Sequence, residues 1–157
     1  MNTTRYASFV TRVICASLVA TQASAAGLAA DALPTGATVK VGSATVSTTG
    51  AAMTIHQSSA KASINWQGFN IGSAASVTIN QPNAQAVLLN RVVGNDASQI
   101  LGKLTANGQV ILINPNGIVF GSGGQVTASA FTASTFALSD TDFSNGKYNY
   151  TRGNSTG

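Results

Sequence analysis

The chain has 157 residues, of which 44% are hydrophobic and only 8% are charged, and its formal net charge is +4. Soluble domains are usually about a quarter charged, so the polar surface has to come from Ser, Thr, Asn and Gln. Glu is absent, and no stretch beyond the N-terminal leader shows the apolar stripe of an amphipathic helix, which excludes a helix-rich protein. The basic residues are scattered singly, so we expect no nucleic-acid partner.

The first 25 residues predict a secretory signal peptide. Arg5 and Arg12 give it a positive start, residues 13–20 form a short apolar core, and a small-x-small site ends at Ala25. We therefore expect cleavage between Ala25 and Ala26. The apolar core is too short for a membrane span, which needs about 20 residues.

Cleavage would remove 25 of the 157 residues and leave 132 without a cysteine, because the single Cys15 lies in the leader. An exported chain without cysteine has no disulfides and is stabilised by its own packing and hydrogen bonds. The loss of Arg5 and Arg12 leaves six basic residues against four aspartates, a net charge of +2. The mature protein is therefore expected to be nearly neutral and to use no thiolate chemistry.

Beyond the leader, short runs of strand-forming residues alternate with turn residues, which is typical of an all-β chain. Corners are expected at Gln81-Pro82-Asn83 and at Asn107-Gly108, because Pro suits the second position of a β-turn and Asn-Gly is a strong turn signal. The expected strands, in chain order, are residues 38–41, 44–47, 53–57, 62–66, 69–71, 76–79, 86–89, 99–104, 109–113, 118–120, 125–127, 130–134 and 136–139.

These runs are too short for a β-sandwich, whose turns come roughly every 8–12 residues. They favour a parallel β-helix, in which each strand pairs with the strand one coil above it. With about 20 residues per coil, residues 26–157 would form one domain of about six coils, about 30 Å long. Val, Ile and Ala should fill the interior, and Asn and Thr side chains should stack in ladders outside.

The two ends of such a β-helix are expected to differ, because an uncapped strand edge invites aggregation. Residues 31–47 are expected to cover the N-terminal end as an antiparallel cap. No helix or charged cap is evident near the C-terminus. We therefore interpret the chain as the N-terminal part of a longer solenoid.

The most informative stretch is residues 109–121, where an apolar run stops at Asn114-Pro115-Asn116-Gly117 and a second run starts at Ile118. The four residues fit a type I β-turn position by position, with Asn first, Pro second for its fixed φ, and Gly fourth. We therefore predict a corner between two strands. Its first role is structural, and recognition by a partner is a second role open to the same residues.

No catalytic, metal or cofactor site can be assembled from the sequence. His56 is the only histidine, and no second His, Cys or carboxylate lies near it with ligand spacing. One histidine and four aspartates give no argument for a Ser-His-Asp triad, and polysaccharide-degrading β-helices need more acidic groups. We expect no enzyme activity, no cofactor and no metal, and we place Trp66 and Phe69 in the core rather than on a sugar-binding surface.

Five motifs lie in order along the mature chain: Ser-Ile-Asn-Trp-Gln-Gly-Phe-Asn-Ile at 63–71, Val-Leu-Leu-Asn-Arg-Val at 87–92, Ser-Gln-Ile-Leu-Gly-Lys-Leu at 98–104, Asn-Gly-Gln-Val-Ile-Leu-Ile-Asn-Pro-Asn-Gly-Ile at 107–118 and Phe-Thr-Ala-Ser-Thr at 131–135. With them, residues 37–135 resemble the secretion domain of two-partner-secreted exoproteins, also called the filamentous haemagglutinin N-terminal or haemagglutination-activity domain. The Ile-Asn-Trp and Asn-Arg-Val motifs are most similar to the high-molecular-weight adhesin branch. The upstream Asn-Pro-Asn-Leu corner of the haemagglutinin branch is absent, and residues 81–84 match it only loosely.

The resemblance implies a right-handed parallel β-helix with an N-terminal cap, which agrees with the strand pattern. It also implies a non-enzymatic secretion domain that crosses the inner membrane through the Sec machinery and reaches the surface of a diderm bacterium through an outer-membrane barrel transporter. The full-length exoprotein would be an adhesin that meets host-cell glycans or receptors. The alternative is a self-contained carbohydrate-binding β-helix adhesin. Candidate recognition residues are Asn114, Pro115, Asn116, Gly117, Ile118, Asn90 and Arg91.

Overall fold

A computed structural model describes residues 27–152 of the protein, so the predicted signal peptide, with Ala25 and Ala26, lies outside the described residues. The regular secondary structure of the described part is twelve strands and one five-residue helix, which confirms the all-β class. Its elements are β1 (Thr38–Val41), β2 (Ala44–Thr49), β3 (Ala52–Gln57), β4 (Lys61–Trp66), β5 (Ser76–Asn80), β6 (Val87–Val92), β7 (Ser98–Ile100), β8 (Lys103–Ala106), β9 (Gln109–Ile113), β10 (Ile118–Phe120), β11 (Gln125–Thr127), β12 (Ala130–Ser134) and α1 (Asp140–Ser144).

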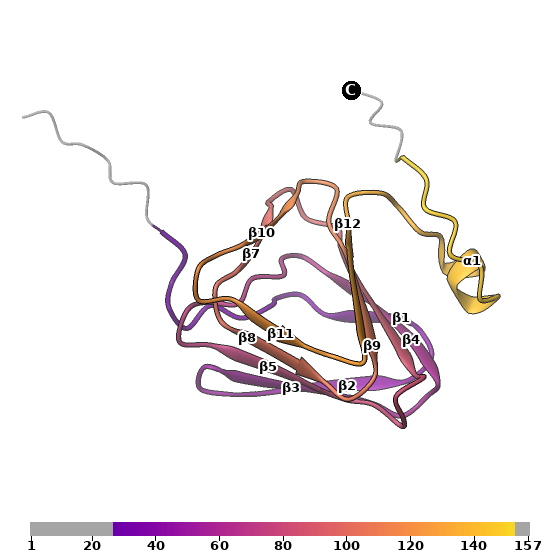
Figure 1. Ribbon diagram of the computed structural model, residues 1–157, viewed down its shortest axis with the longest axis horizontal. Coiled ribbons are helices and arrows are strands. Elements are labelled where there is room, and N and C mark those ends of the chain that lie inside the picture. The colour runs from indigo at the N-terminus through magenta and orange to yellow at the C-terminus, as the bar shows by residue number, and fades with distance from the viewer. Residues whose placement is uncertain (1–26, 153–157) are drawn as a thin grey trace, which may run out of the picture.

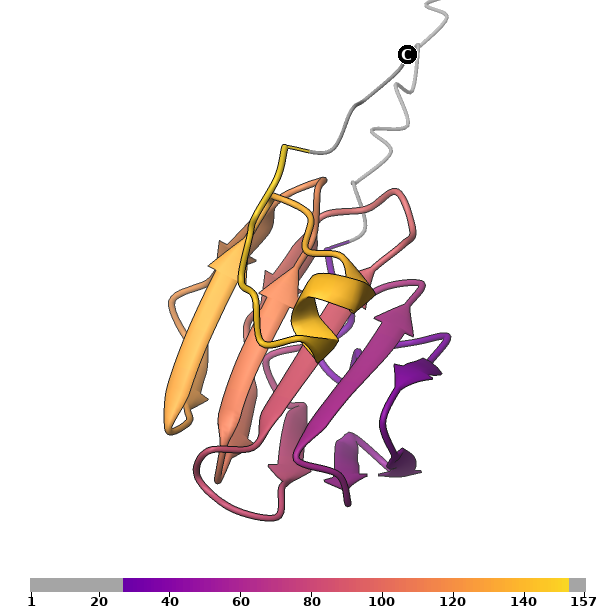
Figure 2. The same cartoon turned by 90° about the vertical axis from the view of Figure 1, so that its right-hand side faces the viewer.

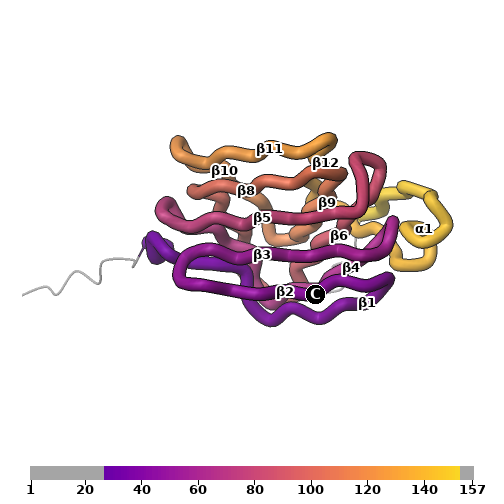
Figure 3. The backbone as a smooth tube through the Cα atoms, turned by 90° about the horizontal axis from the view of Figure 1, so that it is seen from below, coloured from indigo at the N-terminus to yellow at the C-terminus, as the bar shows by residue number. Residues whose placement is uncertain are grey.

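The strands wind into a parallel β-helix with a triangular cross-section (Figure 1). Two of its faces are five-stranded sheets, with the strand orders β1-β4-β6-β9-β12 and β11-β8-β5-β3-β2, and the third is the pair β10-β7. Strands β3, β5, β8 and β11 pair in parallel one above the other, as do β4, β6, β9 and β12. Figure 3 shows the first of these stacks from the side. The predicted parallel β-helix is therefore confirmed.

Within the described residues the chain makes four coils rather than the six expected. The equivalent strands β3, β5, β8 and β11 begin at Ala52, Ser76, Lys103 and Gln125, which pair in register, so one coil takes 22 to 27 residues instead of about 20. In addition, the residues before β3 and after β12 do not wind in parallel. The expected number of coils was therefore too large, because the prediction counted every residue as part of a coil.

Three of the expected strands differ from the structure. Residues 99–104 divide into β7 and β8 at a corner where Gly102 lies so close to the preceding coil that a Cβ would approach the Gly72 carbonyl oxygen to 2.2 Å. Residues 69–71 form only an isolated bridge between Ile71 and Ile100. Residues 136–139 form no strand, because this part of the chain leads into α1.

The hydrophobic core fills the interior of the coils. Inward-facing residues stack between neighbouring coils, for example Ile55 on Ile79 and Leu88 on Val110. Trp66 and Phe69 are 0% and 1% exposed, and their rings meet edge to face at 5.5 Å. Both belong to the core, as predicted, and neither is available to stack on a sugar.

A ladder of threonines runs up the outside of the β11-β8-β5-β3-β2 sheet. The register places Thr54, Thr78, Thr105 and Thr127 directly above one another on four successive strands. Thr54, Thr78 and Thr105 alternate along their strands with buried apolar residues, and Thr127 follows the half-buried Val126. This ladder is the polar, uncharged outer surface that the low charge content predicts.

The N-terminal end of the β-helix is covered by an antiparallel cap. Strand β1 pairs antiparallel with β4, and β2 pairs antiparallel with β3, so both strands of the first coil have a partner on their outer edge. Thr35 adds an antiparallel bridge to Gly68. The predicted cap is confirmed, and its antiparallel strands β1 and β2 cover the edges of the first parallel coil and become the terminal strands of the two sheets.

The C-terminal part of the described chain leaves the coils and covers the outside of the β1-β4-β6-β9-β12 sheet (Figure 2). We call residues 138–150 the C-terminal strap. Its helix α1 begins after Ser139, whose Oγ accepts a hydrogen bond from the Asp142 amide at 3.0 Å, and two aspartates occupy the first turn. The expectation that no helix lies near the C-terminus is therefore wrong. A five-residue helix is too short to show a periodic apolar pattern, and only its N-cap marks it in the sequence.

No helix in residues 27–152 is long and apolar enough to cross a lipid bilayer.

Candidate functional site

The corner at residues 114–117 is a β-turn, as predicted. The Gly117 amide donates to the Asn114 carbonyl at 3.1 Å, which closes the turn. The Asn114 side chain adds a second hydrogen bond inside the turn, in which its Oδ1 accepts from the Asn116 amide at 2.9 Å. Gly117 has a φ of 110°, a conformation that residues with a Cβ rarely adopt. The corner is therefore specified by its own residues.

Asn114 is fully buried and joins three successive coils. Its Nδ2 donates to the Asp96 carbonyl and to the Ser98 Oγ of the preceding coil, both at 2.9 Å. Its backbone amide donates to the Ser134 carbonyl of the following coil at 3.0 Å. Removing the Asn114 side chain would be costly, because the groups that it bonds would lose their hydrogen-bond partner inside the protein. Asn114 is thus a structural residue of the folded domain.

The other residues of the corner lie at the surface. Pro115 and Asn116 are exposed, while the Asn116 Nδ2 holds the Gly94 carbonyl of the preceding coil at 2.8 Å. Ile118 starts β10 and pairs with Ser98, and it packs partly against the core. The next two side chains, Val119 and Phe120, are 53% and 46% exposed. The corner therefore has a buried half that holds the coils and an exposed half that a partner can reach.

Asn90 lies inside the β-helix. It is 0% exposed, its Oδ1 accepts from the Trp66 indole Nε1–H at 3.0 Å, and its Nδ2 points to the Ile111 carbonyl at 3.5 Å. Trp66 needs such a partner because its N–H is buried. In the folded domain the Asn90 side chain therefore provides the hydrogen-bond acceptor for the buried Trp66 N–H, and it does not face a partner protein.

Arg91 points outward from β6 and holds the C-terminal strap. Its guanidinium donates to the Asp140 carboxylate at 3.0 Å, to Asn65 Oδ1 at 3.1 Å and to the Leu138 carbonyl. Ser63 on β4 donates to the same Asp140 oxygen at 3.1 Å. The Arg91 side chain is only 18% exposed, so these bonds are largely shielded from water. Arg91 thus fastens the start of the strap to the sheet.

A second cation holds the other end of α1. The Lys61 Nζ donates to the Phe143 carbonyl at 3.1 Å and to the Ser144 carbonyl at 3.3 Å, and it lies 5.9 Å from the centre of the Phe143 ring. A cation at the carbonyl end and Asp140 in the first turn both suit the helix dipole. Sequence reasoning missed Lys61, Ser63 and Asp140. The Ser139 N-cap with its two following aspartates was the one local signal for this helix.

The described residues contain no cluster of side chains suited to metal binding. No three His, Cys, Asp or Glu side chains in residues 27–152 lie close enough together to hold a metal ion. His56 is exposed on β3, and the closest cation–carboxylate contact of the strap, between Arg91 and Asp140, has a structural role.

Comparisons with known proteins agree with this structure. The family model of the TPS secretion domain matches residues 30–157. The crystal structure of the HMW1 secretion domain from Haemophilus influenzae is similar, with a TM-score of 0.75 and 35% identity, and the match covers 79% of this chain and 33% of that one. Two heme/hemopexin-binding proteins of Haemophilus influenzae are 44% identical over 123 residues and 46% identical over 105 residues, which are 78% and 67% of this chain.

The chain spans only 14% and 11% of the length of those two relatives. The similarity therefore concerns a domain and not a whole exoprotein. The family match extends over residues 30–157, and the fold is shared with a secretion domain of the high-molecular-weight branch. The chain belongs to the TPS secretion-domain family, the non-enzymatic secretion domains of two-partner-secreted exoproteins.

Proposed function

We propose that this chain directs the export of a large exoprotein by presenting its Asn114–Gly117 corner and the strands around it to a dedicated outer-membrane barrel transporter. The observation that carries the proposal is the match of residues 30–157 to the TPS secretion-domain family. Pro115 and Asn116 are accessible in an unfolded chain and stay exposed in the folded domain, so the transporter can reach them in either state. The Sec machinery would deliver the chain to the periplasm, and the transporter would release it at the cell surface. There the exoprotein would act as an adhesin on host glycans or receptors.

The physical properties of the chain support passage through a barrel. The mature chain has no cysteine, so periplasmic disulfides cannot trap it. Its low charge and short strand segments suit the addition of an extended strand to a receptor sheet. Each parallel strand in the folded domain pairs with the one before it, so the completed coils can template the next one outside the cell and help to prevent backsliding.

Asn90 and Arg91 would meet the transporter before folding rather than after it. In the folded domain Asn90 is bonded to Trp66, and Arg91 is bonded to the strap. In an extended chain both side chains are free. We therefore place any contact of these two residues with the transporter in the unfolded or partly folded state.

Secretion in a diderm host, with and without the cognate transporter, tests the proposal. The mature chain behind its own leader should reach the medium only when the transporter is present. The key variant is Asn116→Ala, which removes two side-chain hydrogen bonds, an exposed one to the Gly94 carbonyl and a longer one to Asn114 Oδ1, and should leave the far-UV circular dichroism unchanged. We expect it to reduce secretion several-fold if the exposed half of the corner is recognised.

Two further variants separate recognition from folding. Asn114→Ala should lower the free energy of unfolding by about 1–3 kcal/mol, because it leaves the buried Ser98 hydroxyl without this partner and also removes the bond to the Asp96 carbonyl. Asn83→Ala is the matched control, since Asn83 caps a different corner through the Gln85 and Ala86 amides. Equal secretion losses in Asn116→Ala and Asn83→Ala would limit the 114–117 corner to a structural role. Transporter-independent release of the wild type would overturn the proposed function.

A further inference from the structure

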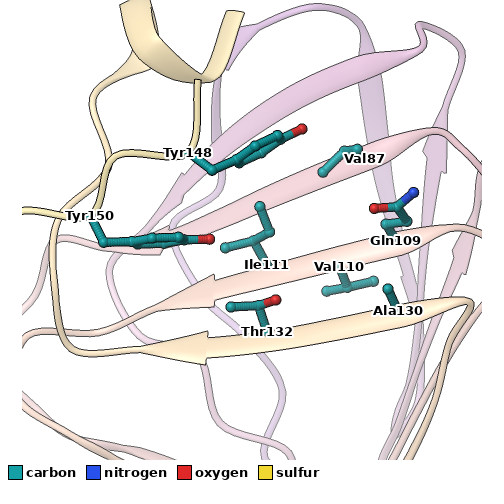
Figure 4. Close-up of a pocket in the computed structure, with 8 residues that line it drawn as sticks. All are labelled: Val87, Gln109, Val110, Ile111, Ala130, Thr132, Tyr148 and Tyr150. Carbon is teal, nitrogen blue, oxygen red and sulfur yellow. The ribbon is translucent and has the colours of Figure 1, made fainter. Parts of the chain in front are cut away.

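The C-terminal strap and the outer face of its sheet enclose a pocket of about 310 Å³ (Figure 4). This volume is at the lower end of the range for small-molecule sites, about 300–1,000 Å³. One wall consists of Tyr148 and Tyr150 of the strap. The floor consists of outward-facing side chains of β6, β9 and β12, namely Val87, Gln109, Ile111 and Thr132.

The two tyrosines contact the apolar cluster beneath the strap, and Tyr148 is 44% exposed. Tyr148 and Tyr150 are alternate residues of an extended segment, and Figure 4 shows both rings lying over the face of the sheet. The Tyr148 ring meets the buried Phe143 edge to face at 6.4 Å, and Tyr150 packs against the cluster that includes Ile111 and Phe143. The bridge between Ala137 and Thr151 ties down the end of the segment. The wall is therefore preorganised, which lowers the entropic cost of binding.

Four uncharged polar groups of this pocket make no hydrogen bond within the described part of the chain. They are the hydroxyls of Tyr148, Tyr150 and Thr132 and the side-chain amide of Gln109, none of which takes part in any side-chain hydrogen bond among residues 27–152. Burial, and then the neighbouring Tyr148, raise the pKa of Tyr150, so its hydroxyl remains a donor at neutral pH. The pocket thus offers several donors and acceptors beside aromatic and aliphatic surface.

The lining contains no charged residue. A ligand with a carboxylate, phosphate or ammonium group would therefore lose its hydration without gaining an ionic partner. A ligand with many hydroxyls and an apolar C–H face suits both components of the pocket, because hydroxyls can bond to the four polar groups while the C–H face lies on a tyrosine ring. Neutral sugars have this combination.

We propose that this tyrosine pocket binds a neutral pyranose sugar, as a mono- or disaccharide. The site differs from the sugar-stacking surface that Trp66 and Phe69 would have formed, since both of those rings are buried. The proposal does not rest on recognition by the transporter, because the pocket exists only in the folded domain, where the strap is in place.

Saturation-transfer difference NMR on the folded mature chain tests the proposal. The probes are glucose, galactose, mannose and N-acetylglucosamine, with sialic acid as the charged comparison. We expect signals from at least one neutral sugar and weaker signals from sialic acid. Tyr148→Ala should weaken the binding of that sugar about tenfold, as expected for loss of one stacking ring. Absence of signal from every neutral sugar at millimolar concentration would overturn the proposal.

Three variants keep the test decisive. Phe136→Ala removes an exposed aromatic ring that does not line the pocket, so it should bind like the wild type. Thr132→Val removes a hydroxyl from an exposed position with little effect on folding, and it should weaken binding several-fold. Tyr150→Phe keeps the ring and removes only its hydroxyl, so it should weaken sugar binding less than Tyr148→Ala does. Wild-type binding by both Tyr148→Ala and Thr132→Val would place any sugar contact elsewhere on the protein.

Secretion of the same variants distinguishes this proposal from the proposed function. Tyr148→Ala and Thr132→Val should be secreted by the transporter as efficiently as the wild type. Failure of sugar binding with normal secretion would refute the pocket alone, whereas sugar binding with transporter-independent release would refute only the export role.

Discussion

The two large sheets of the β-helix differ in what covers their outer faces. The β11-β8-β5-β3-β2 sheet has an open outer face with the ladder Thr54, Thr78, Thr105 and Thr127. The β1-β4-β6-β9-β12 sheet instead has Val87, Leu89, Ile111 and Ile113 on its outer face, all buried against the C-terminal strap. The outer face of one sheet is therefore made of polar side chains exposed to water, whereas the outer face of the other is apolar and is covered by a second layer, the C-terminal strap.

The sequence patterns of the strands reflect this difference. Strand β5, Ser-Val-Thr-Ile-Asn, alternates between exposed and buried residues, as a strand with one solvated face should. Strand β9, Gln-Val-Ile-Leu-Ile, is apolar at four consecutive positions and buried at all four. A continuous apolar run is typical of parallel strands that are covered on both faces. In a β-helix, such a run therefore predicts an additional segment packed on the outside.

The largest expected effect comes from removing a buried side chain under the strap, which would leave a cavity there. Leu89 is 0% exposed in the outer cluster, so Leu89→Ala should lower the free energy of unfolding by about 2–5 kcal/mol. Thr78→Ala on the open sheet is the control and should change it by less than about 0.5 kcal/mol. Urea unfolding followed by circular dichroism measures both. Equal effects of the two substitutions would contradict the distinction between a covered and an open face.

The next effect concerns the attachment of the strap. Arg91→Met keeps the aliphatic stem and removes the bonds to Asp140, Asn65 and the Leu138 carbonyl, which should cost about 1–3 kcal/mol. A double-mutant cycle with Asp140→Asn should give a coupling energy of about 0.2–1 kcal/mol, since the Asp140 side chain is 38% exposed and partly screened by water. Independent effects of the two substitutions would show that the ion pair does not hold the strap.

The start of α1 offers a smaller effect. Ser139→Ala removes the N-cap bond to the Asp142 amide and should cost about 1 kcal/mol. Native-state hydrogen exchange should show faster exchange in residues 138–150 and unchanged exchange in β3, β5 and β8. Uniform acceleration throughout the domain would instead mean that the strap and the coils unfold as one unit.

The smallest effect depends on pH. Burial raises the pKa of Tyr150 above the ordinary value of 10.0, so the folded state holds this proton more tightly than the unfolded state. The resulting stability is fully present below pH 10.0 and is lost as the pH rises through the folded-state pKa. Urea midpoints measured below and above pH 10.0 should fall less for Tyr150→Phe than for the wild type. An identical fall in both proteins would assign the alkaline loss to other groups.

Much of the fold was predictable because its signals are local. The short strands and the Asn114–Gly117 turn follow from residue patterns within a few positions of each other, and the structure confirms them. The N-terminal cap, expected because an uncapped strand edge invites aggregation, is confirmed as well. The candidate site was predictable only in part. The corner is present as expected, but Asn90 and Arg91, neighbours in sequence, point to opposite sides of β6 and serve the core and the strap respectively.

By itself, the sequence determined the all-β class, the coiled arrangement of short parallel strands and the corner at residue 114, because turn chemistry and alternation act over a few residues. Only the tertiary structure decided which outer face is covered, what Arg91 binds and where a pocket forms. The physical reason is separation along the chain: Arg91 and Asp140 are 49 positions apart. No local pattern specifies such a contact, and a strand that is apolar on both faces does not reveal which segment will cover it.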